Sequence, residues 1–426
     1  MGREAMACTN THKRRDFLYT LAGATAAAQF PLAAQAAAKD SRPPNIVLIM
    51  ADDLGYECLG CNGGTSYATP NLDALAAGGV RFTHGFSTPK CGPSRVCIMT
   101  GRYSFRNYIG WGSIPKDEIT FGHMLQRAGY KTALAGKWQM ALLKENPDHV
   151  REMGFQQSSC WAWHEGPRYF DPMIWQNGKI REGISDRYGP DVYCEFLQDF
   201  IRENKNSPFL AYFPMTLPHY AKTGGAYKEP KGPNGEYQTY KEMVEQMDRV
   251  VGNLVKTLDE EGLRENTLIL FTGDNGSPQN VKSKWKGQTV QGGKAKLSDN
   301  GIHVPLIANW QGAAPAGTVC HDLVDFSDFF PTFAEAAGIA PPKGVTIDGR
   351  SFLPQIMGKT GQPHDWIYTE WQGKSIIRTK KWKWYDNGTL YNMLDDPKEQ
   401  NPIPPGEQET VRKRLMGIMK DLKDRS

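Results

Sequence analysis

The chain has 426 residues, too many for one ordinary hydrophobic core, and this length suits a large domain joined to a smaller one. Hydrophobic residues make up 39% and charged residues 23%, a balance that excludes intrinsic disorder and favours a soluble globular protein. The formal net charge is +4, and residues 1–38 hold +2 of it, so the rest of the chain is nearly neutral and gives no case for nucleic-acid binding.

Residues 1–38 have the composition of a targeting segment. Lys13-Arg14-Arg15 precedes a mildly apolar, alanine-rich stretch over 18–32, and the small residues Ala36-Ala37-Ala38 follow. These three parts in this order indicate a bacterial twin-arginine signal peptide, the alternative being a disordered basic tail. The apolar stretch is too short for a stable membrane span, and no later stretch approaches one. We therefore expect the twin-arginine export machinery as a partner and a periplasmic or secreted mature protein.

The first element after this segment is a continuous apolar run at 45–50. Because it lacks the alternation of a half-exposed strand, it predicts a buried strand of a parallel sheet. Asp52 and Asp53 follow at its carboxyl end, where open α/β sheets place their functional sites. Adjacent acids repel each other there unless a cation holds them; a solvated turn is the ordinary alternative.

Helices and strands then alternate along most of the chain. The expected strands are 80–86, 131–135, 209–214, 267–272 and 306–308, and the expected helices are 69–79, 121–128, 191–204, 240–261 and 323–338. This order predicts an α/β fold with a large, mixed, mostly parallel sheet flanked by helices. Residues 145–192 are irregular and aromatic, which indicates an insertion whose Trp161, Trp163 and Trp175 either stack on a substrate ring or pack the insertion onto the domain.

The pattern changes from about residue 348. Alternating segments at 367–371, 374–378 and 381–385 predict antiparallel strands, and 408–422 predicts a terminal helix. We expect two structural domains after the signal peptide, 39–347 and a small α+β subdomain over 348–426.

Polar residues gather where the expected strands end. Asp52, Asp53, Asp274 and Asn275 offer oxygen ligands, which suit Ca²⁺, with Mg²⁺ as the other hard cation that fits. Three cations on separate loops could clamp a tetrahedral anion: Arg95, Lys137 and Lys294. His219, after the strand at 209–214, could act as a general acid. Taken singly, each cation is an ordinary surface charge and His219 an ordinary structural histidine.

One short run differs from these strand ends in that it presents a nucleophile. In Cys91-Gly92-Pro93-Ser94-Arg95, Pro93 is expected to open a helix, with Arg95 about one turn from Cys91. A nucleophile at a helix N-terminus beside a cation suits the stabilisation of negative charge, although a cysteine in a turn before a core helix is the bland alternative. Cys-x-Pro-Ser-Arg, with Thr100-Gly101-Arg102 downstream, resembles the signature of the sulfatase family.

Further motifs extend the resemblance from about Asn45 to the C-terminal subdomain. Pro70-Asn71-Leu72-Asp73 before Gly79-Val80 is similar to the family pattern, as is the segment from Leu390 to Glu399. The resemblance implies an alkaline phosphatase-like fold, with 39–347 as the catalytic domain. Several motifs in the right order make chance agreement improbable, whereas a single motif carries a real false-positive risk.

The resemblance also implies roles for individual residues. Calcium would be held by Asp52, Asp53, Asp274 and Asn275. A formylglycine-generating enzyme would convert Cys91 to formylglycine, which binds the metal and attacks the sulfur of a sulfate ester. Arg95 and Lys137 would fix the nucleophile and the sulfate, while His219 and Lys294 would serve the ester and its leaving group.

The chain departs from the family pattern at two places. Gln139 stands where the family usually has histidine in Gly-Lys-Trp-His, and glutamine cannot accept a proton at useful pH, although it can bond a hydrated aldehyde. Another group or water then acts as the base of the second step, or that step is slow; His123, His149 and His164 are near only in sequence. Residues 299–303, Asp-Asn-Gly-Ile-His, replace Glu-Gly-Gly-x-Arg, which we interpret as a shift in local structure.

The expected function is therefore hydrolysis of a sulfate monoester, from a sulfated small molecule or glycan. Two alternatives stay open: a phosphoester or phosphonate hydrolase with a related site, and a protein that binds sulfated glycan without turnover. The cysteines decide little, because six besides Cys91 remain after the signal and could pair or stay as free thiols. Cys58-x-x-Cys61 has no second pair at zinc spacing, so we discount a zinc site.

Overall fold

A computed structural model describes residues 42–110, 113–162, 165–220 and 230–424. The expected signal peptide, Trp163 and His164 lie outside these residues. Among the helices described, none is both long enough and apolar enough to cross a lipid bilayer.

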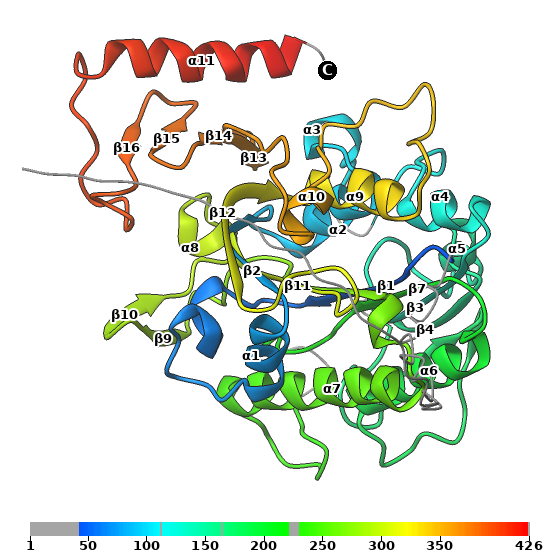
Figure 1. The fold of residues 1–426 in the computed structure, drawn as a ribbon. Coiled ribbons are helices and arrows are strands. Elements are labelled where there is room, and N and C mark those ends of the chain that lie inside the picture. The colour runs from blue at the N-terminus through cyan, green and yellow to red at the C-terminus, as the bar shows by residue number, and fades with distance from the viewer. Residues whose placement is uncertain (1–41, 111–112, 163–164, 221–229, 425–426) are drawn as a thin grey trace, which may run out of the picture. The chain divides into compact units, whose positions relative to one another are not determined.

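A ten-stranded sheet forms the centre of the described chain (Figure 1). Its order is β12 (Thr318–Asp325), β2 (Val80–Phe86), β11 (His303–Asn309), β8 (Thr267–Gly273), β1 (Asn45–Ala51), β7 (Phe209–Pro214), β3 (Lys131–Trp138), β4 (Gln157–Ala162), β5 (Trp175–Gln176) and β6 (Lys179–Ile180). The run β8-β1-β7-β3-β4 is parallel, whereas β11 is antiparallel to both of its neighbours and β5 is antiparallel to β4. The carboxyl ends of β1, β3, β7 and β8 therefore meet at one edge of the sheet.

Helices cover both faces of this sheet (Figure 1). Ile46, Leu48 and Met50 of β1 face one core and Val47 and Ile49 the other, since side chains alternate along a strand. The first core is covered by α2 (Cys91–Thr100), α4 (Phe121–Arg127), α9 (Phe329–Ala336) and α10 (Leu353–Ile356). The second is covered by α1 (Pro70–Ala77), α6 (Gly189–Asn204) and α7 (Tyr240–Glu260). Burial on both faces explains why the strands read as continuous apolar runs.

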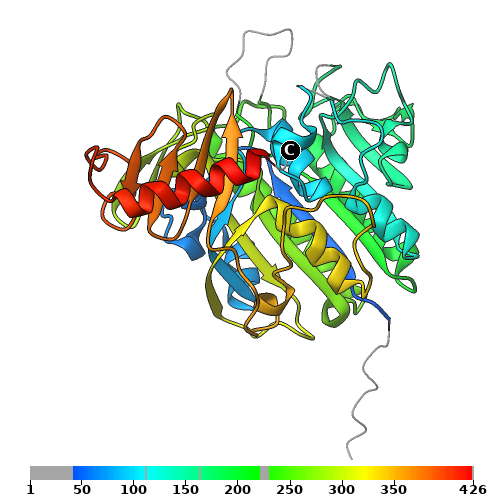
Figure 2. The same cartoon turned by 90° about the horizontal axis from the view of Figure 1, so that it is seen from above.

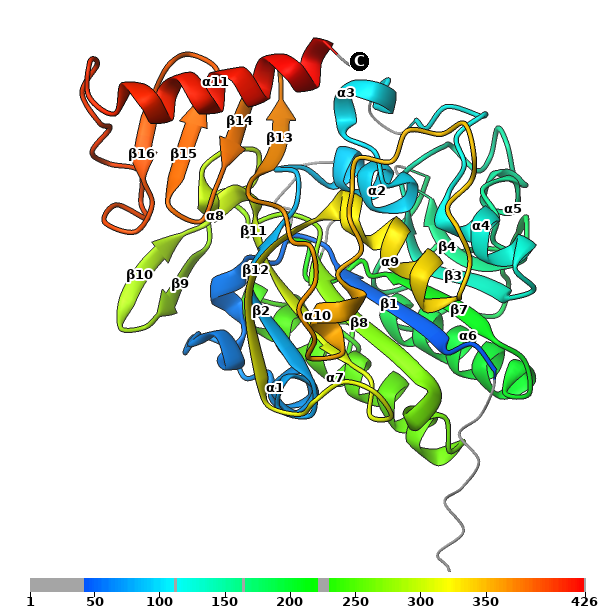
Figure 3. The same cartoon turned by 45° about the horizontal axis from the view of Figure 1, so that its top comes forward.

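A small antiparallel sheet follows near the C-terminus (Figures 2 and 3). It consists of β13 (Ile367–Trp371), β14 (Lys374–Arg378), β15 (Trp382–Tyr385) and β16 (Leu390–Asn392), and α11 (Glu409–Asp424) packs on it through Leu415 and Met419. The remaining elements are short helices, α3 (Ser104–Asn107), α5 (His149–Glu152) and α8 (Asp299–Ile302), and a hairpin of β9 (Lys282–Trp285) and β10 (Gln288–Gln291). The expected fold class is confirmed; the domain boundaries at 38 and 347 stay predictions.

Three local expectations were wrong. The segment 323–338 is not one helix: Leu323–Asp325 end β12, and α9 begins at Phe329 after a 3₁₀ turn in which the Asp325 carboxylate accepts from Ser327 N–H. The helix after β2 begins at Cys91 and not at Pro93, because the first turn of a helix needs no N–H from proline. The segment 145–192 is only partly irregular, since β4 extends the central sheet.

The aromatic side chains of that segment pack onto the domain where the structure describes them. Trp161 is 3% exposed and donates through Nε1 to Gly166 O at 2.7 Å, with the Arg168 guanidinium over its ring. Tyr169 is 1% exposed and joins the core beneath α6. The packing alternative therefore holds for these two rings.

Candidate active site

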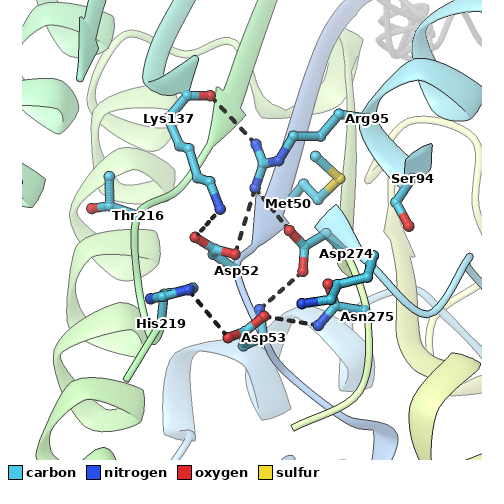
Figure 4. A network of polar contacts seen from close by, with 12 residues as sticks. Met50, Asp52, Asp53, Ser94, Arg95, Lys137, Thr216, His219, Asp274 and Asn275 are labelled. Atoms are coloured by element: carbon cyan, nitrogen blue, oxygen red, sulfur yellow. Dashed lines mark hydrogen bonds and ion pairs between the residues drawn. The ribbon is translucent and has the colours of Figure 1, made fainter. Parts of the chain in front are cut away.

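The edge formed by the carboxyl ends of β1, β3, β7 and β8 brings distant residues together. Asp52 and Asp53 follow β1, Asp274 and Asn275 follow β8, and Lys137 lies near the end of β3. Backbone bonds fix the loops, because Asp52 N–H donates to Leu217 O and Asp274 N–H to Ala51 O, both at 2.8 Å. Figure 4 shows the resulting side-chain network.

Charges of opposite sign contact each other across this network. Lys137 Nζ donates to Asp52 Oδ2 at 2.7 Å, and Arg95 donates to Asp274 Oδ2 at 2.9 Å. Lys294 Nζ lies 2.6 Å from the Asp53 carboxylate. All three carboxylates are at most 1% exposed, so each desolvated charge has a partner of opposite sign.

Asp53 occupies an unusual backbone conformation. Its φ of 70° lies in the left-handed region that residues other than glycine rarely adopt. Tyr240 Oη donates to Asp53 O at 2.7 Å, Asp53 N–H donates to Asp274 Oδ1 at 2.9 Å, and Asn275 Nδ2 donates to Asp53 Oδ1 at 2.8 Å. These bonds hold the turn that presents both acids at the end of β1.

The three acids differ in the direction in which their surroundings shift the pKa. Burial alone would raise the pKa of Asp52, but Lys137, His219 and Arg95 hold that pKa well below its usual range. The pKa of Asp53 is lowered in the same way, against burial, chiefly by Lys294. Burial and the neighbouring Asp52 raise the pKa of Asp274 to about 7 despite Arg95.

His219 lies at the same edge, after a turn that follows β7. Its Nε2 is 3.6 Å from Asp53 Oδ2, and its Nδ1 is buried with no hydrogen-bond partner among the described residues. Burial and Lys294 lower the pKa of His219 to about 3, so the imidazole is neutral at neutral pH.

Cys91 is the first residue of α2 and is 1% exposed. Its Sγ lies with one carboxylate oxygen each of Asp52 and Asp274 in a group whose atoms are all within 4.8 Å of one another. Arg95 follows one helical turn later, also buried. The structure thus places the expected nucleophile against the acids, at a helix N-terminus whose partial positive charge stabilises an anion.

The donor set fits a hard cation. Asp52 Oδ1 and Asn275 Oδ1 are both buried and accept no hydrogen bond from the residues that the structure describes. Two unsatisfied buried oxygens, beside further carboxylate oxygens of Asp53 and Asp274, are what Ca²⁺ or Mg²⁺ would complete.

Cys58 and Cys61, like the other described cysteines, are free thiols.

Gln139 is 2% exposed, and its Oε1 has no hydrogen-bond partner in the described chain. The two described histidines named as possible substitutes for a base have other contacts. His123 caps α4 and bonds Glu152 O at 2.7 Å, and His149 packs against the Trp138 ring at 5.5 Å. Neither has an observed contact with a predicted site residue.

The altered segment 299–303 connects the site to the small sheet. Asp299 pairs with Arg378 at 3.1 Å and with Lys383 at 2.9 Å. His303 stacks on Tyr56, with ring centroids 4.1 Å apart. These contacts fit a change in local structure.

Sequence reasoning missed Thr216, which Figure 4 shows on the side of Lys137 and His219. Its Oγ1 is buried without a hydrogen-bond partner in the described part of the chain. The only signal in the sequence was its position just after β7. Tyr240 was missed as well, because helical periodicity indicates its buried face but not its bond to Asp53.

Known proteins resemble this chain in sequence and in fold. The sulfatase family model matches residues 44–339, and the model of the N-sulphoglucosamine sulphohydrolase C-terminal region matches 293–425. Human arylsulfatase A is 33% identical over 80% of this chain and 75% of its own length. N-acetylgalactosamine-6-sulfatase of Mus musculus is 29% identical over 88% of this chain and 80% of its own length.

Among solved structures, Ps i-CgsB has a TM-score of 0.75 and 27% identity over 89% of this chain and 93% of that chain. The phosphonate monoester hydrolase of Agrobacterium radiobacter shares the fold, with a TM-score of 0.65 and 19% identity over 90% of this chain and 96% of that chain. The match to the sulfatase model covers more than half of the chain, and the buried acids at the strand ends fit a metal site. The protein belongs to the sulfatase family and is a sulfuric ester hydrolase.

Proposed function

We propose that the protein is an exported, calcium-dependent sulfatase that hydrolyses sulfate esters of a carbohydrate through a formylglycine made from Cys91. The single observation that carries the proposal is the position of Cys91, at the N-terminus of α2 and against the Asp52 and Asp274 carboxylates. A structural cysteine gains nothing from carboxylate neighbours, whereas a converted side chain would offer oxygen to the same cation that they bind.

Asp52, Asp53, Asp274 and Asn275 would hold the cation. When bound, it offsets the negative charge of the sulfate ester and of the attacking oxygen. Arg95, Lys137 and Lys294 add three fixed positive charges on separate elements, and these stabilise the charge that grows on the sulfate oxygens.

In the first step one hydroxyl of the hydrated formylglycine attacks sulfur, and the bond from sulfur to the alcohol oxygen breaks. His219 gives that oxygen a proton, so the alcohol leaves neutral. In the second step the other hydroxyl loses its proton to a base, the bond from carbon to the sulfate oxygen breaks, and the aldehyde returns. Two steps of moderate barrier replace one difficult step.

The role of His219 requires that it carry a proton when substrate is bound. Its lowered pKa results from burial and from the nearby Lys294, which outweigh the opposing effect of the Asp53 and Asp52 carboxylates. A sulfate ester beside the imidazole would favour the charged form and raise that pKa.

A sulfated carbohydrate is the proposed substrate class. The relatives include an N-acetylgalactosamine-6-sulfatase, and Ps i-CgsB has been solved in complex with a neocarrahexaose. The first name points to a sugar sulfate and the second to an oligosaccharide, so sulfated oligosaccharides are the compounds to test first.

The test is a parallel assay of sulfate release and phosphate release. We expect sulfate from 4-nitrophenyl sulfate and from at least one sulfated oligosaccharide, with 4-nitrophenyl phosphate turned over much more slowly. Faster turnover of the phosphate ester would replace the proposal with a phosphoester hydrolase. Tight binding of sulfated glycan by fully modified protein, with no release of sulfate, would instead indicate a binding protein.

Export rests on the segment Lys13-Arg14-Arg15, the apolar stretch after it and the alanines at 36–38. We expect the mature chain in the periplasm or medium, beginning at Lys39. N-terminal sequencing checks this, and replacement of both Arg14 and Arg15 by lysine should retain the full-length precursor in the cytoplasm. Unchanged export of that variant would argue against the twin-arginine route.

A further inference from the structure

The hairpin of β9 and β10 grows out of the segment that carries Lys294. Its two ends are joined by Gly292 N–H, which donates to Val281 O at 2.9 Å, and Lys294 N–H donates to Ser277 O at 3.0 Å. Figure 3 shows the hairpin projecting beside α8. A ligand that reaches Lys294 therefore lies close to the base of this hairpin.

The hairpin is strongly basic. The whole chain has nearly as many acidic as basic residues, but residues 278–297 contain no acid. They contain five lysines: Lys282, Lys284, Lys286, Lys294 and Lys296. In the part of the chain that the structure describes, no carboxylate forms an ion pair with Lys282, Lys284 or Lys286, whereas other exposed lysines, such as Lys241, Lys256 and Lys420, pair with an acid four residues away. Among the described residues, these three lysines therefore have no carboxylate partner, whereas Lys294 is paired with Asp53.

One face of the hairpin gathers the donors. Lys282 lies opposite Gln291 and Lys284 opposite Thr289, and residues directly opposite in an antiparallel pair share a face. All four are exposed, and Lys284 Nζ donates to Thr289 Oγ1 at 2.7 Å. Lysines two residues apart on a strand stand about 7 Å from each other. The face offers two ammonium groups and a hydroxyl, while the Gln291 amide donates to Gln279 O and, at 3.2 Å, to Val281 O.

The free edge of β9, together with Trp285 on the opposite face, fastens the hairpin to the loop that follows Asp53. Trp285 Nε1 donates to Asn62 O at 2.8 Å, Lys286 N–H to Gly63 O at 3.0 Å, and Thr65 N–H to Lys284 O at 3.0 Å. Tyr56 meets the Trp285 ring edge-on, with centroids 6.2 Å apart. A solvated, mobile charge cluster needs no such anchoring. The donors are held in a fixed position relative to the acids at the end of β1, which lowers the ordering cost of binding.

We propose that the Lys282–Lys284 face of this hairpin is a second binding site, which takes sulfate groups of the sugars that flank the one being hydrolysed. This inference rests on the proposed action on sulfated carbohydrate and extends it to a polymer or long oligosaccharide with several sulfates. Lys284 is three residues from Val281, so the face extends about 10 Å outward from the base of the hairpin. Its cations and hydrogen-bond donors match the oxygens of repeated sulfate esters.

The test compares wild type with Lys282→Gln/Lys284→Gln on a long and a short ligand. Glutamine keeps the length and polarity of the side chains and removes two charges. We expect binding of fluorescent dextran sulfate to weaken at least fivefold at about 0.1 M salt, where charges interact over about 10 Å, and the difference to shrink near 1 M. The kcat/KM for 4-nitrophenyl sulfate, which cannot reach the hairpin, should stay within twofold.

The matched control is Lys205→Gln/Lys256→Gln, which removes two exposed lysines near the other ends of the strands. It changes the net charge equally and should bind dextran sulfate like the wild type. Equal affinity in wild type and hairpin variant, or equal loss in the control, would overturn the proposal. If poly-glutamate competes as well as dextran sulfate, the face attracts any polyanion and is not a site for sulfate groups. If wild type releases no sulfate but the binding difference remains, the proposed function fails and the second site stands.

Discussion

Three buried carboxylates face two buried cations and one part-buried cation at the carboxyl end of the central sheet. Asp52 is paired with Lys137, Asp53 with Lys294 and Asp274 with Arg95. Removing one partner of such a pair leaves a desolvated charge that costs about 3–5 kcal/mol, so each substitution here acts on stability as well as on chemistry. Side chains outside these pairs are therefore the cleaner probes of mechanism.

Gln139 is one such probe. Because glutamine cannot take the proton of the second step, we expect that step to limit turnover, with a burst of nitrophenol from 4-nitrophenyl sulfate close to one equivalent per active site. Gln139→His supplies a base, which should shrink the burst and raise kcat about tenfold or more. Stopped-flow measurements of both proteins check this.

The control is Gln139→Met, which removes the amide but supplies no base and should keep the burst. A wild type without a burst, or a histidine variant with unchanged kcat, would mean that another group already serves the second step.

His303 gives a pH-dependent prediction away from the acids. Burial, with help from Arg378 and Lys383 and against Asp299 and the Thr83 carbonyl, lowers the pKa of His303 to about 4. In the unfolded chain the pKa of His303 is about 6.5. At a pH between the folded and the unfolded pKa, the unfolded state therefore binds one proton more than the folded state. The contribution of neutral His303 to the free energy of unfolding is thus present above pH 6.5 and lost as the pH falls towards 4.

We expect wild type to lose about 2 kcal/mol more than His303→Gln between pH 7.5 and pH 4.5, because glutamine does not titrate. Urea denaturation at the two pH values measures the difference; titrating groups that do not interact with His303 cancel in the comparison, whereas Asp299 and His84 do interact with it. An equal loss in both proteins would show that His303 titrates normally.

At the scale of elements, the small C-terminal sheet holds the segment that carries Lys294. Lys383 of β15 is fully buried and bonds Asp299 at 2.9 Å and Glu399 at 2.8 Å. Asp299 N–H also donates to Glu399 Oε1 at 2.8 Å. The first turn of α8 is therefore clamped by charges from β15 and from the chain after β16.

Lys383→Met leaves Glu399 buried without its cation, and we expect a loss of about 3 kcal/mol in the free energy of unfolding. The loss of the clamp should also raise KM more than it lowers kcat. The matched control is Lys380→Met, whose half-exposed ammonium pairs with Asp322 at 3.2 Å and should contribute less than about 1 kcal/mol. Similar losses in both variants would contradict a special role for Lys383.

Some elements could be predicted from sequence and others could not. The apolar runs at β1, β7 and β8 predicted buried strands because both faces of the sheet are covered, and the polar residues after them followed from the geometry of parallel strands. The hairpin of β9 and β10 was missed because its residues are polar and its anchors, such as Asn62, lie far away in the sequence. The segment 323–338 was misjudged because the Asp325 cap, which ends a strand, looks like the interior of an apolar helix.

The site residues, like the elements, could be predicted only where a local sequence pattern marks them. Asp52, Asp53, Asp274 and Asn275 could be named because each follows an apolar run that a pattern detects. Thr216 and Tyr240 could not, since their importance comes from a tertiary contact that leaves no local signal.

At the scale of the whole molecule, the central sheet depends on what binds at its carboxyl edge. Asp52 Oδ1 and Asn275 Oδ1 accept no hydrogen bond from the described residues, and Arg95 lies 3.9 Å from Asp52 Oδ1, so a bound cation should stabilise the folded state over the unfolded chain. Ligand at a hundredfold excess over its Kd contributes about 2.7 kcal/mol. We expect EGTA and EDTA to lower the thermal midpoint by several degrees, and Ca²⁺ to restore it.

Differential scanning calorimetry measures that shift without reference to activity. Asp274→Asn, which weakens the donor set, should show a much smaller response to Ca²⁺ under identical conditions. If the wild type melts at the same temperature with chelator and with added Ca²⁺ or Mg²⁺, the folded protein binds neither cation.

The chemistry depends on whether Cys91 is converted to formylglycine, which mass spectrometry of the tryptic peptide 91–95 from active enzyme measures. We expect an aldehyde to replace the –CH₂SH group in a fraction of molecules that rises with specific activity, and we expect Cys91→Ala to be folded but inactive. A fully active preparation in which every Cys91 is an unmodified thiol would contradict this expectation.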